Sequence, residues 1–167
     1  LGDVYKRQYF PWVIKPIWSP FVDLIKTKRW WIYSMQLLIG GGMAGVAFVL
    51  PGDFFLRFTL AFFWLMAFSS ATHDIAADGF YMLGLTEVQQ AFFIGIRNTF
   101  YRVAMLTGQG LLVMLAGLLE ESTGRISFAW SLVFFVLAGT FIALALWHKY
   151  ILPRPASDAQ RTNITPH

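Results

Sequence analysis

Residues 126–147 read ISFAWSLVFFVLAGTFIALALW, and none of these side chains is charged. A helix needs about 20 predominantly apolar residues to cross the hydrocarbon core of a bilayer, and this stretch is long enough. Two further stretches have the same character. Residues 30–50 are mostly apolar up to the turn sequence Pro51-Gly52-Asp53, and residues 54–80 are mostly apolar as far as Phe68 and more polar beyond it. The sequence therefore predicts three clear membrane-spanning helices.

Two more stretches are apolar but less regular. Residues 92–119 carry Arg97 and Arg102 in their first half, so we expect one long helix whose charged half faces protein rather than lipid. Residues 9–23 contain three prolines and Lys15, and their apolar part rises only about 21 Å as a helix. We expect this first span to be truncated.

The composition of the chain supports the same fold class. Of its 167 residues, 57% are hydrophobic, 18% aromatic and only 13% charged, whereas about 25% are charged in a soluble domain. One core of this size cannot bury so many large apolar side chains. The absence of Cys excludes a disulfide scaffold, a thiolate metal site and a Cys nucleophile within these residues. We therefore predict an all-α polytopic membrane protein with about five spans, the first truncated, at 9–23, 30–50, 54–80, 92–119 and 126–147.

Basic residues are distributed unevenly between the loops that these spans define. One side of the membrane receives six of them and the other side two. The six are Lys26, Lys28, Arg29, Lys149, Arg154 and Arg161, and the two are Arg57 and Arg125. Because loops rich in Lys and Arg stay in the cytoplasm, we predict that the Lys26 loop and the C-terminus are cytoplasmic. The net charge of +4 then reflects topology, and we expect no nucleic-acid partner.

The two ends of the sequence differ from the rest. Residues 1–8 include Asp3, Lys6 and Arg7 and cannot extend the first span, and the first Met is Met35, inside the second span. We interpret residues 1–8 as a non-native scar and residues 9–150 as the helical bundle. Residues 151–167 are mostly polar beyond Pro153 and are interpreted as a loop or linker.

Two acidic side chains stand in the polar half of the third span. Asp74 and Asp78 are four residues apart and share one face of a helix. If the following turn centres near Leu85, Asp74 lies eleven residues before it and Arg97 twelve after it, at similar depth. Two interpretations stay open. Asp74, Arg97 and Arg102 form a proton or substrate relay in a cavity, or an ion pair anchors two helices with Asp78 at the headgroup level.

Other positions carry further candidate side chains. Lys15 is eight residues from Asp23, about 12 Å along a helix, and either reaches the interface or faces a cavity. Gly41 and Gly45 have the spacing that lets helix backbones approach closely in lipid, so we assign them to helix packing. His73 has two Asp neighbours, but one His and two Asp do not make a metal site, and we expect no metal and no cofactor.

Three helical motifs and one loop, in the same order along the chain, resemble one transporter family. PWVIKPIWSPFVD at 11–23 resembles helix two of the muropeptide-permease-like (AmpG-like) branch of the major facilitator superfamily. Asp23 with Lys28 and Arg29 resembles the superfamily's signature loop between helices two and three. ATHDIAADGF at 71–80 is similar to the family's segment near the cytoplasmic end of helix four, with His73 in place of Gln. YRVAML at 101–106 resembles the start of helix five's membrane core.

The resemblance implies a fold, an activity and a location. Residues 9–150 would form helices two to six of a partial N-terminal six-helix bundle, and 151–167 would begin the cytoplasmic linker to a missing C-terminal bundle. The implied protein is no enzyme but a proton-coupled symporter of the bacterial cytoplasmic (inner) membrane, carrying a small, muropeptide-like solute by alternating access. Its partners would be the lipid bilayer, the solute, protons and that second bundle. The gate would comprise Asp23, Lys28 and Arg29, and the transport and coupling residues Lys15, Asp74, Asp78, Arg97 and Arg102.

Two other functions fit parts of the sequence. A small membrane scaffold subunit would need a natural start and stop at these ends, and six more spans beyond His167 in the reading frame would exclude it. An intramembrane metal-dependent transferase would hold a divalent cation on Asp74 and Asp78. Such enzymes need further acidic residues nearby, and the predicted spans supply none within the membrane.

Overall fold

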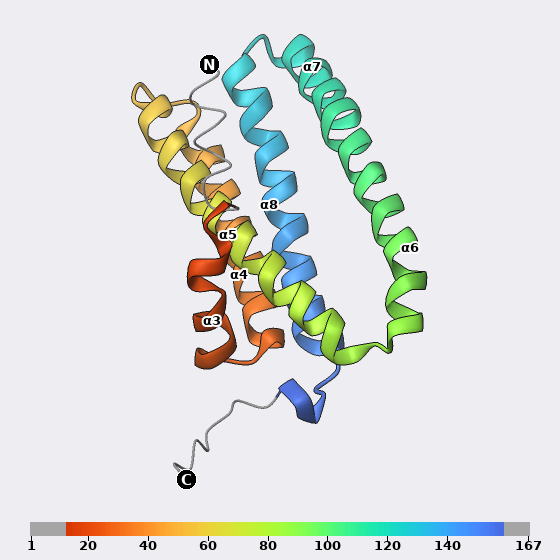
Figure 1. Cartoon of the computed structure of the whole chain (residues 1–167). Coiled ribbons are helices and arrows are strands. Elements are labelled where there is room, and N and C mark those ends of the chain that lie inside the picture. Colours follow the sequence, from red (N-terminus) through yellow and green to blue (C-terminus); the bar gives the residue numbers. More distant parts are fainter. Residues whose placement is uncertain (1–12, 159–167) are drawn as a thin grey trace.

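The computed structural model describes residues 13–158, in which every regular element is a helix (Figure 1). The elements are α3 (Lys15–Ile25), α4 (Lys28–Val49), α5 (Phe55–Gly84), α6 (Glu87–Leu106), the π-helical turn η1 (Thr107–Leu111), α7 (Leu112–Thr123), α8 (Ile126–Ile151) and the 3-10 turn η2 (Ala156–Asp158). The interpretation of residues 1–8 as a scar lies outside the described residues, as does the beginning of the predicted span 9–23.

Four of these segments are long and apolar enough to cross a membrane: α4, α5, the continuous run Glu87–Thr123, and α8. The prediction of an all-α polytopic membrane protein is therefore confirmed. α3 has 11 residues, which is too few for a span by itself. Pro16 stands in its first turn, where a missing backbone N–H is tolerated, and Pro20 lies inside the helix.

Helix ends follow the turn chemistry of the sequence. α4 ends at Val49, next to the predicted turn. α6 begins at Glu87 rather than at 92, because Thr86 and Gln89 form a capping box in which each side chain accepts a hydrogen bond from the other's backbone N–H. α7 ends at Thr123, where Gly124 adopts a left-handed φ of 67° that glycine tolerates without steric cost.

α4 is the central helix, and it packs against both α5 and α8. Glycines make these contacts close. A Cβ added to Gly45 would lie 2.4 Å from the ring of Phe62, and one added to Gly42 would lie 2.6 Å from Met66, both in α5. On the other side, a Cβ on Gly40 would lie 2.9 Å from a side chain of α8. Small residues therefore allow three helices to approach one another, as is common in membrane proteins.

Gly41 does not take part in this close contact. It is exposed, and no heavy atom of the described residues outside its own helix lies within 4 Å of an added Cβ. Each residue turns an α-helix by about 100°. Since Gly40 faces α8 and Gly42 faces α5, Gly41 points outward between them. Among the described residues, the close contacts of α4 are therefore made at Gly40, Gly42 and Gly45, and the packing role of Gly41 stays a prediction.

α6 and α7 differ in how they meet the rest of the bundle. α7 packs against α8 and buries Ala116, whereas α6 buries no residue among those described. In Figure 1, α6 diverges from α8 toward its junction with α5. Large apolar side chains of α6 such as Phe92 and Phe100 stay exposed. Such a face suits contact with lipid or with further protein.

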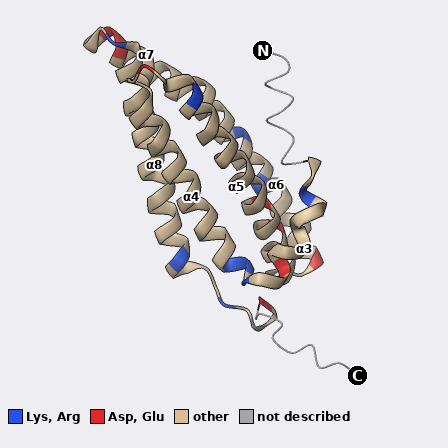
Figure 2. Ribbon diagram, turned by 90° about the vertical axis from the view of Figure 1, so that its left-hand side faces the viewer, with Lys and Arg blue, Asp and Glu red and all other residues tan. Residues whose placement is uncertain are grey.

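Charged residues concentrate toward the ends of the helices (Figure 2). The loop that holds Lys26 lies at the same end of the molecule as the end of α8, because the side chain of Arg29 donates a hydrogen bond to the carbonyl of Leu152. Arg57 and Arg125 belong to the opposite end, where α5 and α8 begin. Among residues 13–158 the basic residues are thus segregated as the sequence predicts, whereas Arg161 lies outside the described residues. The cytoplasmic orientation stays a prediction.

Candidate functional site

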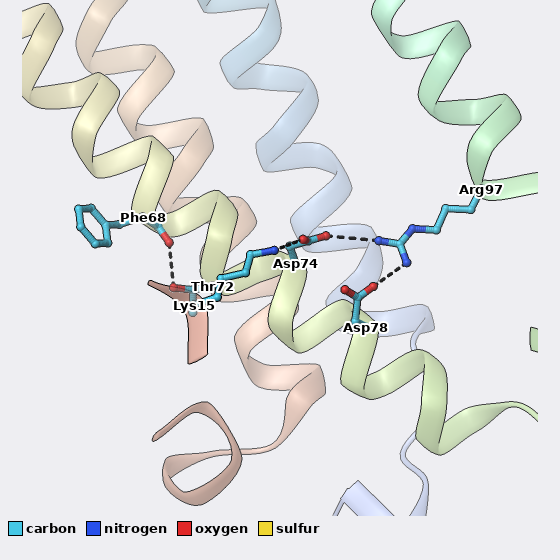
Figure 3. A network of polar contacts seen from close by, with 6 residues as sticks. All are labelled: Lys15, Phe68, Thr72, Asp74, Asp78 and Arg97. Carbon is cyan, nitrogen blue, oxygen red and sulfur yellow. Dashed lines mark hydrogen bonds and ion pairs between the residues drawn. The ribbon is translucent and has the colours of Figure 1, made fainter. Parts of the chain in front are cut away.

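An ionic network joins three helices at the polar half of α5 (Figure 3). Lys15 of α3 forms an ion pair with Asp74 of α5. Arg97 of α6 reaches both acidic residues of α5: its Nη1 lies 2.5 Å from Oδ1 of Asp78, and its Nη2 lies 3.3 Å from Oδ1 of Asp74. These four side chains are called the α5 ionic network below.

Helical spacing and side-chain geometry explain this arrangement. Asp74 and Asp78 lie on successive turns of α5, so their carboxylates face the same way. The planar guanidinium of Arg97 presents several N–H groups and can serve both carboxylates at once. Asp74 gives one oxygen to Lys15 and the other to Arg97. It is therefore the residue that links α3 to α6.

The charges of the α5 ionic network cancel. Two cations and two carboxylates sum to zero, which lowers the cost of placing them in a spanning helix, where an unpaired charge costs about 2.5–3.5 kcal/mol at the centre on insertion scales. The Lys15 side chain is 23% exposed and that of Asp74 37%, whereas that of Arg97 is 53% exposed. The network thus runs from an enclosed end at α3 to an open end at α6.

Neighbouring hydroxyl groups of α5 are satisfied within their own helix. The hydroxyl of Thr72 donates to the carbonyl of Phe68 at 2.8 Å, as Figure 3 also shows, and Ser69 donates to Leu65 at 2.7 Å. Ser and Thr commonly bond to the carbonyl four residues earlier in a helix. In this half of α5, polar contacts to α6 are therefore made by Asp74, Asp78 and the hydroxyl of Tyr81, which donates to the carbonyl of Gln90.

The structure brings together four of the five predicted transport residues, namely Lys15, Asp74, Asp78 and Arg97. The similar depth expected for Asp74 and Arg97 corresponds to a direct contact. Lys15 forms an ion pair with Asp74, and both of its interpretations stay predictions. Arg102 is exposed and makes no ion pair among residues 13–158. Five residues turn α6 by roughly 140° beyond a full turn, so Arg102 points away from the face that carries Arg97.

The predicted gate residues lie at the end of the bundle where α3 meets α4. Lys28 forms an ion pair with Asp23. Its side chain is only 13% exposed and lies over Gly79 of α5, where an added Cβ would be 2.7 Å from Cε of Lys28. Within residues 13–158 the side chain of Arg29 binds no carboxylate. It donates from Nε to the carbonyl of Leu152 at 3.0 Å and from Nη2 to that of Lys149.

Among the polar contacts that sequence reasoning missed are one between α4 and α8 and one at the start of α4. Gln36 is buried inside α4, and its Oε1 lies 2.8 Å from Nδ1 of His148 in α8. The only sequence signal was one amide in an apolar span. Asp158 is 8% exposed and accepts hydrogen bonds from the backbone N–H groups of Lys28 and Arg29. No residue pattern marks that contact, because its donors are backbone groups.

His73 lies next to the α5 ionic network without joining it. Its Nε2 atom is buried and has no hydrogen-bond partner among the described residues. Within residues 13–158, no three His, Cys, Asp or Glu side chains converge as a metal site would require. Both carboxylates that the transferase interpretation would use are instead in contact with cationic side chains.

The chain is similar to curated proteins over part of its length. It is 31% identical over 110 residues to the anhydromuropeptide permease of Escherichia coli (strain K12), and equally to that of Escherichia coli O157:H7. Each match covers 63% of this chain and 22% of the relative, so the match takes in about a fifth of the length of these relatives. No family model and no solved structure matches the chain. The comparison thus links this integral membrane protein to a permease, at low identity.

Proposed function

We propose that this chain is part of a secondary transporter of the major facilitator superfamily, in its muropeptide-permease-like branch. The observation that carries the proposal is the α5 ionic network, because charged side chains shared between spanning helices mark ion and solute pathways in membrane proteins. The similarity to anhydromuropeptide permeases supports the same class of function. In this proposal the chain supplies most of one helical bundle, and a second bundle completes the solute pathway.

The proposed coupling ion is the proton, and the proposed acceptor is Asp74. This carboxylate holds Lys15 with one oxygen and Arg97 with the other. Protonation of Asp74 removes the carboxylate charge that binds Lys15 and one side of Arg97. The link from α5 to α3 is then lost, and the link to α6 is left to Asp78 alone. Loss of the proton restores them. A proton therefore changes the attachment of three helices at once, which is the kind of step that alternating access requires.

The solute in this proposal is a small muropeptide-like anion. Arg97 is half-exposed and Arg102 is exposed. A guanidinium binds a solute carboxylate through paired hydrogen bonds, so either residue suits the acidic group of such a solute. Asp23, Lys28 and Arg29 act at the gate. The end of the bundle that holds them faces the cytoplasm of a bacterial cell across the inner membrane, in accord with its excess of basic residues.

Transport by the longest natural reading frame that contains this chain tests the proposal. The protein is reconstituted into liposomes, and uptake of a labelled anhydromuropeptide is measured with and without an imposed proton gradient. We expect gradient-driven uptake that Asp74→Asn abolishes. Asp53→Asn, a change in the loop between α4 and α5, serves as the matched control and should leave uptake intact. Uptake that ignores the gradient would refute proton coupling, and normal uptake by Asp74→Asn would refute the assigned role of this carboxylate.

A further inference from the structure

The segment that follows α8 returns to the beginning of α4. An α-helix leaves its first N–H groups without acceptors inside the helix. In α4, the N–H of Trp30 is bound by the hydroxyl of Thr27 at 3.1 Å. Asp158 binds the preceding two, with 2.7 Å from the N of Lys28 to Oδ1 and 3.1 Å from the N of Arg29 to Oδ2. The cap of α4 is therefore completed by a residue 130 positions away in the sequence.

The surroundings of Asp158 explain why its carboxylate binds the start of α4. Asp158 is 8% exposed, and a buried carboxylate is tolerated only where hydrogen-bond donors replace water. The start of a helix supplies both the donors and the positive end of the helix dipole. A turn holds the carboxylate in place, since the N–H of Asp158 donates to the carbonyl of Pro155 at 3.0 Å.

The other end of the same segment is also attached. Leu152 packs against the buried cluster formed by Val22, Ile32 and Ala76. Its carbonyl accepts the Nε–H of Arg29 at 3.0 Å, and the carbonyl of Lys149 accepts a second bond from the same guanidinium. Basic side chains commonly satisfy the free carbonyls at a helix C-terminus. Arg29 thus binds the end of α8 with its side chain and Asp158 with its backbone.

We propose that residues 152–158 form a strap that fixes the loop between α3 and α4 beneath the bundle. Lys28 is the residue through which the strap acts, because its backbone binds Asp158 while its side chain binds Asp23 and lies over Gly79. The strap therefore positions the ion pair of α3 and α4 as well as the start of α4. This inference concerns the described helices alone and does not depend on the proposed transport function.

Amide hydrogen exchange in the 167-residue chain, held in lipid nanodiscs, tests the strap. We expect Asp158→Ala to accelerate exchange at the amides of Lys28 and Arg29 about tenfold, in line with the loss of a helix cap. The Trp30 amide, capped by Thr27, should keep its rate. Thr27→Ala is the matched control and should reverse the pattern, with fast exchange at Trp30 and little change at the other two amides.

A second variant covers the case in which Asp158→Ala disturbs the whole fold. Asp158→Asn keeps one carbonyl oxygen and the shape of the side chain, so one of the two amides should stay protected while the other exchanges faster. Unchanged rates at both amides in Asp158→Ala would overturn the proposal. Equal acceleration at all three amides in Asp158→Asn would also overturn it, because the loss would then not be specific to the strap.

Discussion

Lys28 of α4 lies across Gly79 of α5, so closely that a methyl group on Gly79 would stand 2.7 Å from Cε of the lysine and 3.0 Å from its Nζ. No side chain larger than hydrogen fits there while Lys28 stays in place. The glycine thus provides the space in which Lys28 reaches Asp23. In this way a residue of α5 supports an ion pair between the two helices that precede it.

Gly79→Ala should move the lysine rather than unfold the protein. The atoms that the new methyl group meets are the far end of a flexible side chain, and alanine favours a helix over glycine by roughly 1 kcal/mol. We expect stability within about 1 kcal/mol of the parent and faster acylation of Lys28, whose side chain is now largely enclosed. Mass spectrometry after limited amine labelling measures the rate at which Lys28 is acylated. Gly95→Ala is the control, because an added Cβ there meets no other element of residues 13–158 within 4 Å. Equal Lys28 labelling in both variants would contradict the prediction.

Replacement by alanine should change the stability of the protein differently at two glycines of α4. Gly45→Ala places a methyl group 2.4 Å from the ring of Phe62 and should destabilise the protein by about 1–3 kcal/mol through overpacking. Gly41→Ala meets no neighbouring helix among the described residues and should be neutral or stabilising by about 0.4–1 kcal/mol. Reversible unfolding in mixed micelles, followed by circular dichroism, gives both values. A stable Gly45→Ala protein would show that α4 and α5 are farther apart than described.

Arg97 should couple energetically to both acidic residues of α5. Its contact with Asp78 is 2.5 Å and that with Asp74 is 3.3 Å. A double-mutant cycle of Arg97→Gln with Asp78→Asn should give a coupling of about 0.5–1 kcal/mol, modest because the guanidinium is 53% exposed. The cycle with Asp74→Asn should give less.

The same measurement has a control on α6. Arg102→Gln should show no coupling to either acidic residue, because Arg102 makes no ion pair within the described chain. If Arg102 couples as strongly as Arg97, the effect reflects total charge, and the specific contacts of the α5 ionic network do not account for it.

The partly buried contact between Gln36 and His148 should cost more stability when one partner is removed than when both are removed. Gln36→Leu removes the acceptor and leaves the ring N–H of His148 without a partner, at a cost of about 1 kcal/mol. The double variant with His148→Leu removes both groups and should recover most of that loss. Chemical unfolding of the three variants measures the difference. A double variant less stable than Gln36→Leu alone would indicate that His148 has another role.

Hydropathy and turn residues predict the spanning helices well. The apolar stretches 30–50 and 126–147 correspond to α4 at Lys28–Val49 and α8 at Ile126–Ile151, because an apolar face that must meet lipid leaves a long, uninterrupted signal. The start of α6 at Glu87 depends on two hydrogen bonds between Thr86 and Gln89, which a hydropathy scan does not contain.

Only part of the candidate site can be predicted from the sequence. Antiparallel geometry places Arg97 beside Asp74, since both lie a similar number of residues from one turn. Lys15 belongs to α3, whose position depends on packing against α5 and not on a short connection to it. Asp158 binds backbone N–H groups, so the residues it contacts carry no side-chain signature of the contact.

The π-helical turn η1 sets the rotation of α6 about the helix axis relative to that of α7. A π turn holds one residue more than an α-helical turn, and each residue rotates the helix by about 100°. The face of α6 that carries Arg97 is therefore set apart from the face of α7 that buries Ala116. Deleting one residue within Thr107–Leu111 would rotate α6 so that Arg97 points away from α5, while α7 would still pack against α8. No side chain of either face would need to change.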